Sequence, residues 1–281
     1  MTYSKLVQDY FKKWELAPIR LIAQTRTSEI IEVEASNQIY ILKVLNEIGR
    51  SSERNSPFVL ESWNGNGAVK LIKHSDSALL LEKLLEPNLY ELSKNGEEDK
   101  ASSIFIGIIK KIHSVRIDSL SGKLPKLDSI FRYFEKTPED MESKEIFLKA
   151  HKIGEQLLKS TKREVVLHGD LHHENVLQRI SGEYVCFDPK GYIGDPCYEI
   201  ATILKNPWDY PDISENEQIC LDRARSFSES LDLSYERIIA FSFVHMCLSV
   251  LWSKVGGVGN YQHQLKIASF LSKHVKEGYC D

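Results

Sequence analysis

The sequence predicts an α+β fold of two lobes, a small β-rich lobe followed by a larger helical one. Short β-branched runs separated by turns occupy the chain from Ile19 to Leu84, whereas beyond Leu92 apolar residues recur at helical spacing. At 281 residues the chain is long enough for two lobes that each bury a core. We therefore expect a β-rich lobe at residues 1–84 and a helical lobe at residues 85–281, with a ligand site between them.

The first lobe is expected to contain five antiparallel strands and one helix, after an amphipathic helix at residues 3–15. Ser56 followed by Pro57 predicts the start of the lobe's helix, which would run to Trp63 before the turn Asn64-Gly65-Asn66-Gly67. The predicted strands cover residues 19–23, 30–34, 38–45, 68–73 and 78–84.

The second lobe is expected to be mainly helical. Its most apolar run, Ile238–Trp252, is shorter than a membrane span and carries Ser242 and His245, so we expect a buried helix there. The predicted helices cover residues 97–115, 128–140, 143–161, 196–205, 215–231, 234–255 and 261–276.

Two polar clusters follow short apolar runs in the middle of the second lobe. HGDLHHEN (168–175) comes directly after Val165–Leu167, and DPKG (188–191) comes after Tyr184–Phe187. Ser181-Gly182 predicts a hairpin turn between them. We therefore expect the two apolar runs to be neighbouring strands and the two polar clusters to lie together.

The spacing of these polar residues is typical of phosphoryl transfer. A carboxylate, a carboxamide five residues later and a second carboxylate after a hairpin form that layout. Asp170 would orient the attacking hydroxyl and take its proton, at the Asp-to-Asn spacing of the kinase pattern His-Arg-Asp-x-x-x-x-Asn, with Gly169 in place of the arginine. Asn175 and Asp188 offer hard oxygen ligands, which suit Mg²⁺.

The first cluster also has an interpretation as a zinc hydrolase site. Its three histidines, together with Asp170, provide ligands that Zn²⁺ accepts. The order of these ligands differs from that of the common histidine-aspartate zinc hydrolases, and Asn175 and Asp188 would have no role in such a site. Phosphoryl transfer is therefore the favoured interpretation.

Lys43 lies inside the third predicted strand, among the apolar residues 41–45. A lysine with such neighbours needs an anionic partner or an exposed edge. It is either an edge-strand lysine or the lysine that binds the α- and β-phosphates of ATP. Glu53 or Glu61 could pair with it, and the sequence does not decide between them.

Composition and charge exclude several classes of protein. The net charge of −4 and the ordinary apolar content favour neither disorder nor a general nucleic-acid binder. The first 14 residues contain no signal-peptide core. We expect a cytoplasmic monomer without nucleic-acid or membrane partners. Reduced thiols are predicted because the cysteines are odd in number and form no CxxC pair: Cys186, Cys197, Cys220, Cys247 and Cys280.

The two clusters with their flanks resemble the aminoglycoside 6-phosphotransferase and hydroxyurea phosphotransferase family of bacterial antibiotic kinases. The matching strings are HGDLHHENVL (168–177) and FDPKGYIGDPCYEIA (187–201). IYILKVL (39–45), LESWNGNGAVKLI (60–72) and ALLLEKL (78–84) extend the likeness to most of the chain. The resemblance implies a protein-kinase-like fold and ATP-dependent phosphorylation of a hydroxyl on a small antibiotic, conferring resistance.

The resemblance also implies roles for individual residues. Glu174 departs from the small residue usual in this motif, and Glu199 stands where aspartate is expected. The positions that match the family's functional residues are Asp170 as the catalytic aspartate, Asn175 and Asp188 as Mg²⁺ ligands, Lys43 as the phosphate-binding lysine, and Glu82 and Leu84 as backbone contacts to adenine.

Three hypotheses for the function are considered, and two of them differ in the acceptor. A hydroxylated, cationic antibiotic of the streptomycin type needs a wide acidic cleft, whereas hydroxyurea or another small metabolite needs a small polar one. A kinase-like protein that only binds nucleotide is disfavoured because no catalytic position is missing. The acids of the helical lobe that could bind guanidinium or ammonium groups include Glu199, Asp209, Asp212, Asp222 and Glu229.

Overall fold

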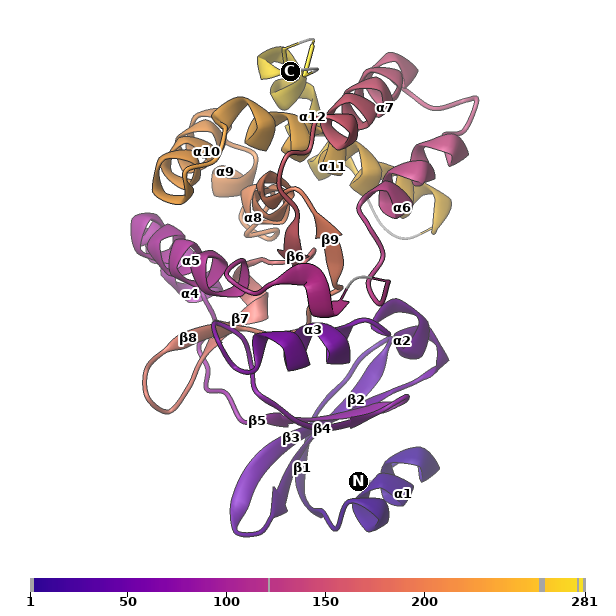
Figure 1. Cartoon of the computed structure of the whole chain (residues 1–281), viewed down its shortest axis with the longest axis vertical. Helices are drawn as coiled ribbons and strands as arrows, with labels where there is room; N and C mark the ends of the chain where they lie inside the picture. The colour runs from indigo at the N-terminus through magenta and orange to yellow at the C-terminus, as the bar shows by residue number, and fades with distance from the viewer. Residues whose placement is uncertain (1–2, 121, 258–260, 277, 280–281) are drawn as a thin grey trace.

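The structure, a computed structural model, describes residues 3–120, 122–257, 261–276 and 278–279. A sheet lobe and a larger helical lobe lie one above the other, with α1 and α12 at opposite ends of the molecule (Figure 1). This is the two-lobe α+β arrangement expected from the sequence.

The sheet lobe contains a five-stranded antiparallel sheet in the order β1-β2-β3-β5-β4. β3 is the central strand, and Lys43 on it pairs with Ile30 on one side and Leu79 on the other. The interpretation of Lys43 as an edge-strand lysine is therefore wrong. The strands are β1 (Ala17–Gln24), β2 (Ser28–Ala35), β3 (Gln38–Leu45), β4 (Leu71–Ser75) and β5 (Ala78–Glu82).

The two faces of the sheet pack against different helices. Because side chains alternate along a strand, Leu80 joins the small core under α1 (Lys5–Lys13), while Leu79 and Leu81 join the main core together with α3 (Ser56–Trp63). The sheet is thus held between α1 and α3, and only its α3 face adjoins the helical lobe (Figure 1).

A short helix that the sequence analysis did not expect, α2 (Glu47–Ser52), precedes α3. Asn46 caps it by accepting from the Gly49 N–H at 3.0 Å. Gly49 packs so closely on the β1–β2 loop that an added Cβ would lie 2.3 Å from the Thr27 carbonyl oxygen. The β1–β2 loop is therefore packed directly against α2.

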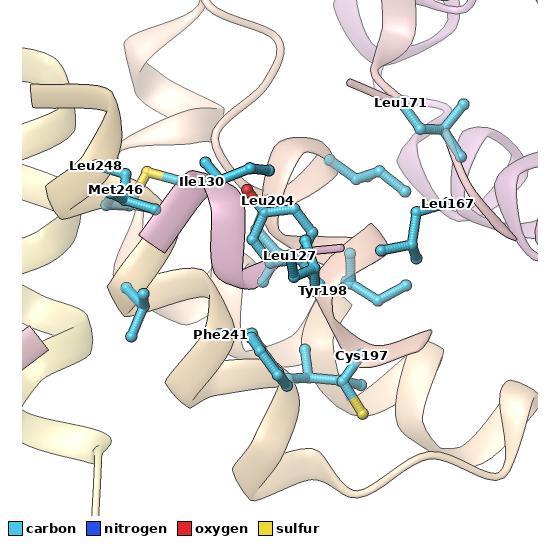
Figure 2. Packing of buried hydrophobic residues seen from close by; sticks show 14 of the residues in the cluster. Leu127, Ile130, Leu167, Leu171, Cys197, Tyr198, Leu204, Phe241, Met246 and Leu248 are labelled. Carbon is cyan, nitrogen blue, oxygen red and sulfur yellow. The ribbon is translucent and has the colours of Figure 1, made fainter. Parts of the chain in front are cut away.

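The helical lobe is built around α11, whose residues Ile238–Leu251 are all buried. At 21 residues this helix is long and apolar enough to cross a membrane by composition, yet 78% of its most apolar window is buried inside the protein. The expectation of a buried helix is confirmed, and its bounds lie close to the expected range of residues 234–255. Phe241 on it packs edge-to-face on Tyr198 with the ring centroids 6.0 Å apart (Figure 2).

The remaining helices lie close to the expected ranges, with one clear exception. The helix expected at residues 128–140 is a single turn, α6, followed by a 3₁₀ turn at Arg132–Lys136, because Pro138 prevents its continuation. The described helices of this lobe are α4 (Tyr90–Lys94), α5 (Glu98–Ile112), α6 (Asp128–Phe131), α7 (Lys144–Lys159), α8 (Ile200–Leu204), α9 (Pro211–Ser214), α10 (Glu217–Leu231), α11 (Tyr235–Val255) and α12 (Gln262–His274).

The expected pairing of the two apolar runs beside the polar clusters is wrong. β6 (Val165–Leu167) pairs with β9 (Tyr192–Gly194), and β8 (Tyr184–Cys186) pairs with β7 (Val176–Gln178). The turn at Ser181-Gly182 does close a hairpin, but its first strand is β7, which the sequence analysis did not identify. Two small two-stranded ribbons therefore replace the single expected pair.

Candidate active site

Backbone hydrogen bonds bring the two polar clusters together although their preceding strands are not partners. The N–H groups of Lys190 and Gly191 donate to the His168 carbonyl at 2.8 and 3.2 Å. The Phe187 N–H donates to the Asn175 carbonyl at 3.0 Å. The two loops, 168–175 and 187–191, thus form one polar surface between the lobes.

His168 supports this surface from within. It is fully buried, its Nε2 lies 2.8 Å from the Phe187 carbonyl oxygen, and its Nδ1 accepts from the Asp170 N–H at 3.3 Å. Burial lowers the pKa of His168. A neutral ring with its proton on Nε2 satisfies both contacts, so His168 links the two loops.

Glu199 holds the first loop from below. Its carboxylate is 1% exposed and accepts from the N–H groups of His168 at 2.7 Å and Gly169 at 3.0 Å. Burial raises the pKa of Glu199, but the contact with His113 at 3.3 Å and the two N–H donors outweigh it and lower the pKa overall. The expectation that Glu199 favours a cationic acceptor is wrong, because this carboxylate is used inside the protein.

Asp170 projects from the loop with its side chain 31% exposed. Burial raises its pKa, but the neighbouring His172, Lys205 and Lys190 outweigh it and lower the pKa overall. The Lys190 ammonium lies 3.9 Å from the carboxylate, which makes Lys190 a partner of Asp170. Asp170 is therefore ionised at neutral pH and able to accept a hydrogen bond from a hydroxyl.

Asn175 and Asp188 offer two oxygens that suit a hard cation. The Asn175 amide nitrogen donates to the Asp170 carbonyl at 2.9 Å, which leaves the amide oxygen free of that contact. Asp188 adopts the left-handed region with φ of 63°, and its side chain is 33% exposed. Mg²⁺ commonly keeps several waters and binds through one or two such groups, so this pair fits it.

Among the described residues no group of three or more His, Cys, Asp and Glu side chains is arranged to hold a metal ion. His173, which the zinc interpretation used, is buried against the Phe105 ring, with the two ring centroids 5.0 Å apart. The histidines of the first cluster therefore contribute to the scaffold of the loop.

Lys43 is held between two carboxylates and is 5% exposed. Its ammonium forms ion pairs with Glu53 at 2.6 Å and with Asp188. Burial lowers the pKa of Lys43, but the two carboxylates outweigh it and raise the pKa overall. Glu53 is thus the helix-side partner, while Glu61 contacts His74 at 3.0 Å instead.

Glu82 and Leu84 lie where the chain leaves the sheet. The Glu82 N–H donates to the Lys70 carbonyl at 3.0 Å, whereas the Leu84 N–H donates to no acceptor among the described residues. The Glu82 carboxylate also forms an ion pair with the Arg179 guanidinium at 2.8 Å. Arg179 further donates to the carbonyls of Gly65 and Ala68 at 2.9 and 2.8 Å, so it ties the β7–β8 hairpin to the sheet lobe.

A cavity of about 650 Å³ opens beside Asp170 and reaches from the α2–α3 segment into the helical lobe. Its lining carries one carboxylate, Asp170, and the basic side chains of Arg54, Lys190, Lys205 and His245. The cleft expected for a streptomycin-type acceptor is therefore wide, but its lining is not acidic.

The acids named for a cationic acceptor lie outside the lining of this cavity. Asp222 is exposed and pairs with Arg225 at 3.1 Å, and Asp209 is exposed near Glu174. Burial, Asp209 and Asp170 all raise the pKa of Glu174, so these three carboxylates lie near one another at the loop surface.

Sequence reasoning missed the polar side chains on the cavity wall. Lys205 directly follows α8, His245 lies on α11, and Tyr198 lies in the turn before α8; all three share the cavity with Asp170. His245 was noted only as a polar residue within an apolar run. Local patterns carry no signal that these positions meet.

Comparison with known proteins agrees with this geometry. The family described as "Aminoglycoside/hydroxyurea antibiotic resistance kinase" matches residues 13–257. A streptomycin 3''-kinase from Klebsiella pneumoniae is 27% identical over 198 residues, covering 70% of this chain and 71% of the relative. A streptomycin 6-kinase from Streptomyces griseus is 25% identical over 230 residues, covering 76% and 71%.

The fold is that of known phosphotransferase structures. A thermostable mutant of an aminoglycoside phosphotransferase, in ternary complex with ADP and hygromycin B, superposes with a TM-score of 0.68 at 14% identity, covering 96% of this chain and 98% of the other. This likeness confirms the expected protein-kinase-like fold.

Proposed function

The chain belongs to the aminoglycoside/hydroxyurea antibiotic resistance kinase family and is a phosphotransferase, and on this premise we propose that it transfers the γ-phosphoryl group of ATP to a hydroxyl of a streptomycin-type antibiotic, conferring resistance. The observation that carries the proposal is the position of Asp170. Its ionised carboxylate lies at the edge of the 650 Å³ cavity and in the same polar surface as Asn175 and Asp188.

In this proposal the two lobes, residues 1–84 and 85–281, hold ATP between them. The carbonyl of Glu82 and the N–H of Leu84 contact the adenine edge, and Lys43 binds the α- and β-phosphates. The Lys43 ammonium is already fixed between Glu53 and Asp188, so its position is set before nucleotide arrives. Positioning of this kind supplies most of the catalysis in phosphoryl transfer.

Asp170 acts on the acceptor. Its carboxylate accepts a hydrogen bond from the attacking hydroxyl, holds that oxygen in line with the γ-phosphorus and takes the proton late, because the transition state is loose. A lowered pKa suits this role, since the group has to be ionised before it can orient the hydroxyl. Asn175 and Asp188 would hold Mg²⁺, which neutralises charge on the phosphate oxygens.

The size of the cavity supports an antibiotic with several rings. Its volume of about 650 Å³ is typical of sites for drug-sized ligands, and hydroxyurea would fill only a small part of it. Glu174 and Asp209, outside the lining, provide a place for the cationic groups of such an acceptor.

We also propose that the protein is a cytoplasmic monomer. Cys186, Cys197, Cys220 and Cys247 are buried and unpaired, which supports a reducing compartment, while Cys280 lies outside the described residues.

Product mass tests the proposed function. The purified protein is incubated with Mg·ATP and, separately, with streptomycin, hygromycin B and hydroxyurea, and the mass of each compound is measured. We expect a gain of one phosphoryl group on streptomycin. A gain on hydroxyurea alone, or on none of the three compounds, would contradict the proposed acceptor.

Asp188→Asn tests the proposed metal site separately from the acceptor. It keeps the shape of the side chain but weakens a proposed metal ligand, so the gain on streptomycin should slow, and its dependence on Mg²⁺ concentration should shift to higher concentrations. An unchanged metal dependence would remove Asp188 from the metal site while leaving the acceptor assignment standing.

A further inference from the structure

Three polar side chains form a row in the wall of the cavity beside Asp170. The Tyr198 hydroxyl lies 2.8 Å from His245 Nδ1, and His245 Nε2 lies 3.3 Å from the Lys205 ammonium. Tyr198 and His245 are 1% and 2% exposed, and the ring of Tyr198 lies within the apolar cluster shown in Figure 2. All three residues line the cavity.

The hydrogen-bonding capacity of these groups fixes the direction of the row. Burial lowers the pKa of Lys205 overall, while the nearby Asp170 carboxylate favours its ammonium form. As an ammonium Lys205 can only donate, so it requires His245 Nε2 to be the acceptor. Burial holds the pKa of His245 well below its ordinary value, and the ring is therefore neutral with a single proton. That proton must lie on Nδ1, where it is donated to the Tyr198 oxygen.

The row consequently ends in donors that the protein does not use. With its oxygen accepting from His245, the Tyr198 O–H has no acceptor among the described residues, and the Lys205 ammonium has no hydrogen-bond partner there other than His245. Tyr198 is buried, where polar groups are normally paired, whereas Lys205 is half-buried, and both donors line the cavity. A bound molecule is the natural acceptor for them.

We propose that Lys205 and Tyr198 form a subsite that binds an oxygen atom of the acceptor, a hydroxyl, ring oxygen or carbonyl next to the hydroxyl that Asp170 activates. The inference rests on the proposed function, because it places the acceptor in this cavity. His245 is a positioning residue, since it acts by fixing the two donors.

The charges of the cavity lining also favour an acceptor that presents oxygen atoms. Arg54, Lys190 and Lys205 repel an ammonium or guanidinium group from the cavity, and Asp170 is the only carboxylate in the lining that the structure describes. The portion of the acceptor inside the cavity is therefore neutral and rich in oxygen. Its cationic substituents face the carboxylates of Glu174 and Asp209 outside.

Kinetics of two substitutions test the subsite. Lys205→Met removes a charged donor of similar length, and Tyr198→Phe removes only a hydroxyl. With streptomycin as acceptor, we expect kcat/KM to fall about 10- to 100-fold in Lys205→Met and about 3- to 10-fold in Tyr198→Phe, mainly through a higher KM for streptomycin. The KM for ATP should stay within twofold of the wild type, on the order of experimental error.

Two matched substitutions serve as controls. Lys100→Met changes an exposed lysine that pairs with Glu97 on the surface, and Tyr235→Phe changes a tyrosine outside the cavity; both should behave as the wild type. A KM for streptomycin that is unchanged or lower in Lys205→Met would overturn the subsite, since a cation that merely repels the acceptor gives the lower value.

A spectroscopic measurement of the His245 proton tests the subsite without enzyme turnover. Nitrogen-15 spectra of labelled histidine, with His245→Gln to assign the signal, should show the His245 proton on Nδ1, and a proton on Nε2 would overturn the proposal. If the wild type phosphorylates none of the compounds offered, the proposed function fails, and this proton position then decides the subsite alone.

Discussion

The two sides of Asp170 hold their cations in opposite ways. On the side facing the sheet lobe, Lys43 is buried between the carboxylates of Glu53 and Asp188. On the side of the cavity, Lys205 contacts the neutral ring of His245 and has no ion pair among the described residues. One cation is neutralised by the protein itself, and the other still requires an acceptor.

This difference indicates how each side chooses its ligand. A lysine fixed by two carboxylates is positioned for a single geometry, as the phosphates of one nucleotide require. A lysine with free donors selects by hydrogen bonding, because an acceptor that lacks the matching oxygen leaves buried donors unpaired. Nucleotide binding is thus rigid and acceptor binding selective, and the predictions below test that distinction.

The largest effect on activity is expected at Asp170, where the two sides meet. Asp170→Asn keeps the shape of the side chain but removes the charge that orients the hydroxyl, so kcat should fall about 10²- to 10⁴-fold. Nucleotide and streptomycin affinities, measured by calorimetry, should stay near the wild-type values. Nearly full activity in this variant would show that another group activates the acceptor.

Glu199→Ala should destabilise the shared loop beneath both sides. It leaves the buried N–H group of His168 and the half-buried N–H group of Gly169 without their acceptor, at about 1–3 kcal/mol for each orphaned donor. We expect the free energy of unfolding, measured in urea, to fall by about 2–5 kcal/mol. Glu217→Ala, which removes an exposed acid paired with His274, is the control and should change it little.

Lys43→Met should affect the nucleotide side alone. Loss of a charge-assisted hydrogen bond to phosphate should raise the KM for ATP about 10- to 100-fold while the KM for the acceptor stays constant. Lys43→Met also leaves the buried Glu53 carboxylate without its cation, which should lower the free energy of unfolding. The double variant Lys43→Met/Glu53→Gln should recover part of that loss, because it removes the unpaired carboxylate. A change confined to the KM of the acceptor would contradict the division into two sides.

The last prediction is a dependence of stability on pH. Burial is the main cause that lowers the pKa of His172 and of His173 to about 4, below the value of about 6.5 expected in the unfolded chain. Between these values the unfolded chain binds more protons, so the free energy of unfolding should fall as the pH is lowered from 6.5 toward 4. Each histidine contributes a slope of up to about 1.4 kcal/mol per pH unit.

Urea titrations at several pH values within this window measure the slope, and His173→Asn should reduce it by one histidine's share. Glu98 provides a separate check at lower pH. Burial raises its pKa, but contacts with His173 and Arg223 lower it to about 2 overall. Its contribution is therefore present above about pH 4.3 and is lost only as the pH falls from there toward 2. A flat profile between pH 6.5 and 4 would contradict the neutral histidines.

Local sequence was sufficient for most of the longer elements and for the motif. Alternating apolar residues marked the strands of the sheet, helical periodicity marked the longer helices, and Ser56-Pro57 marked the start of α3. The polar clusters at 168–175 and 188–191 could be recognised because their chemistry is encoded within a few residues. The roles of Asp170, Asn175, Asp188, Lys43, Glu82 and Leu84 stay predictions, and the experiments above address them.

Tertiary structure alone decided which distant residues meet. Periodicity cannot distinguish Glu53 from Glu61 as the partner of Lys43, because the choice depends on how α2 and α3 are placed against β3. Nor can it pair β6 with β9, since hydrogen bonds between short strands depend on the path of the chain between them.

The cavity wall shows the same limit most clearly. Tyr198, Lys205 and His245 come from separate elements, and each in isolation is an ordinary polar residue near apolar neighbours. They become a directed row of donors only because α11 packs against α8 in the core of the helical lobe. Contacts between residues far apart in the chain arise from packing, which local sequence patterns do not encode.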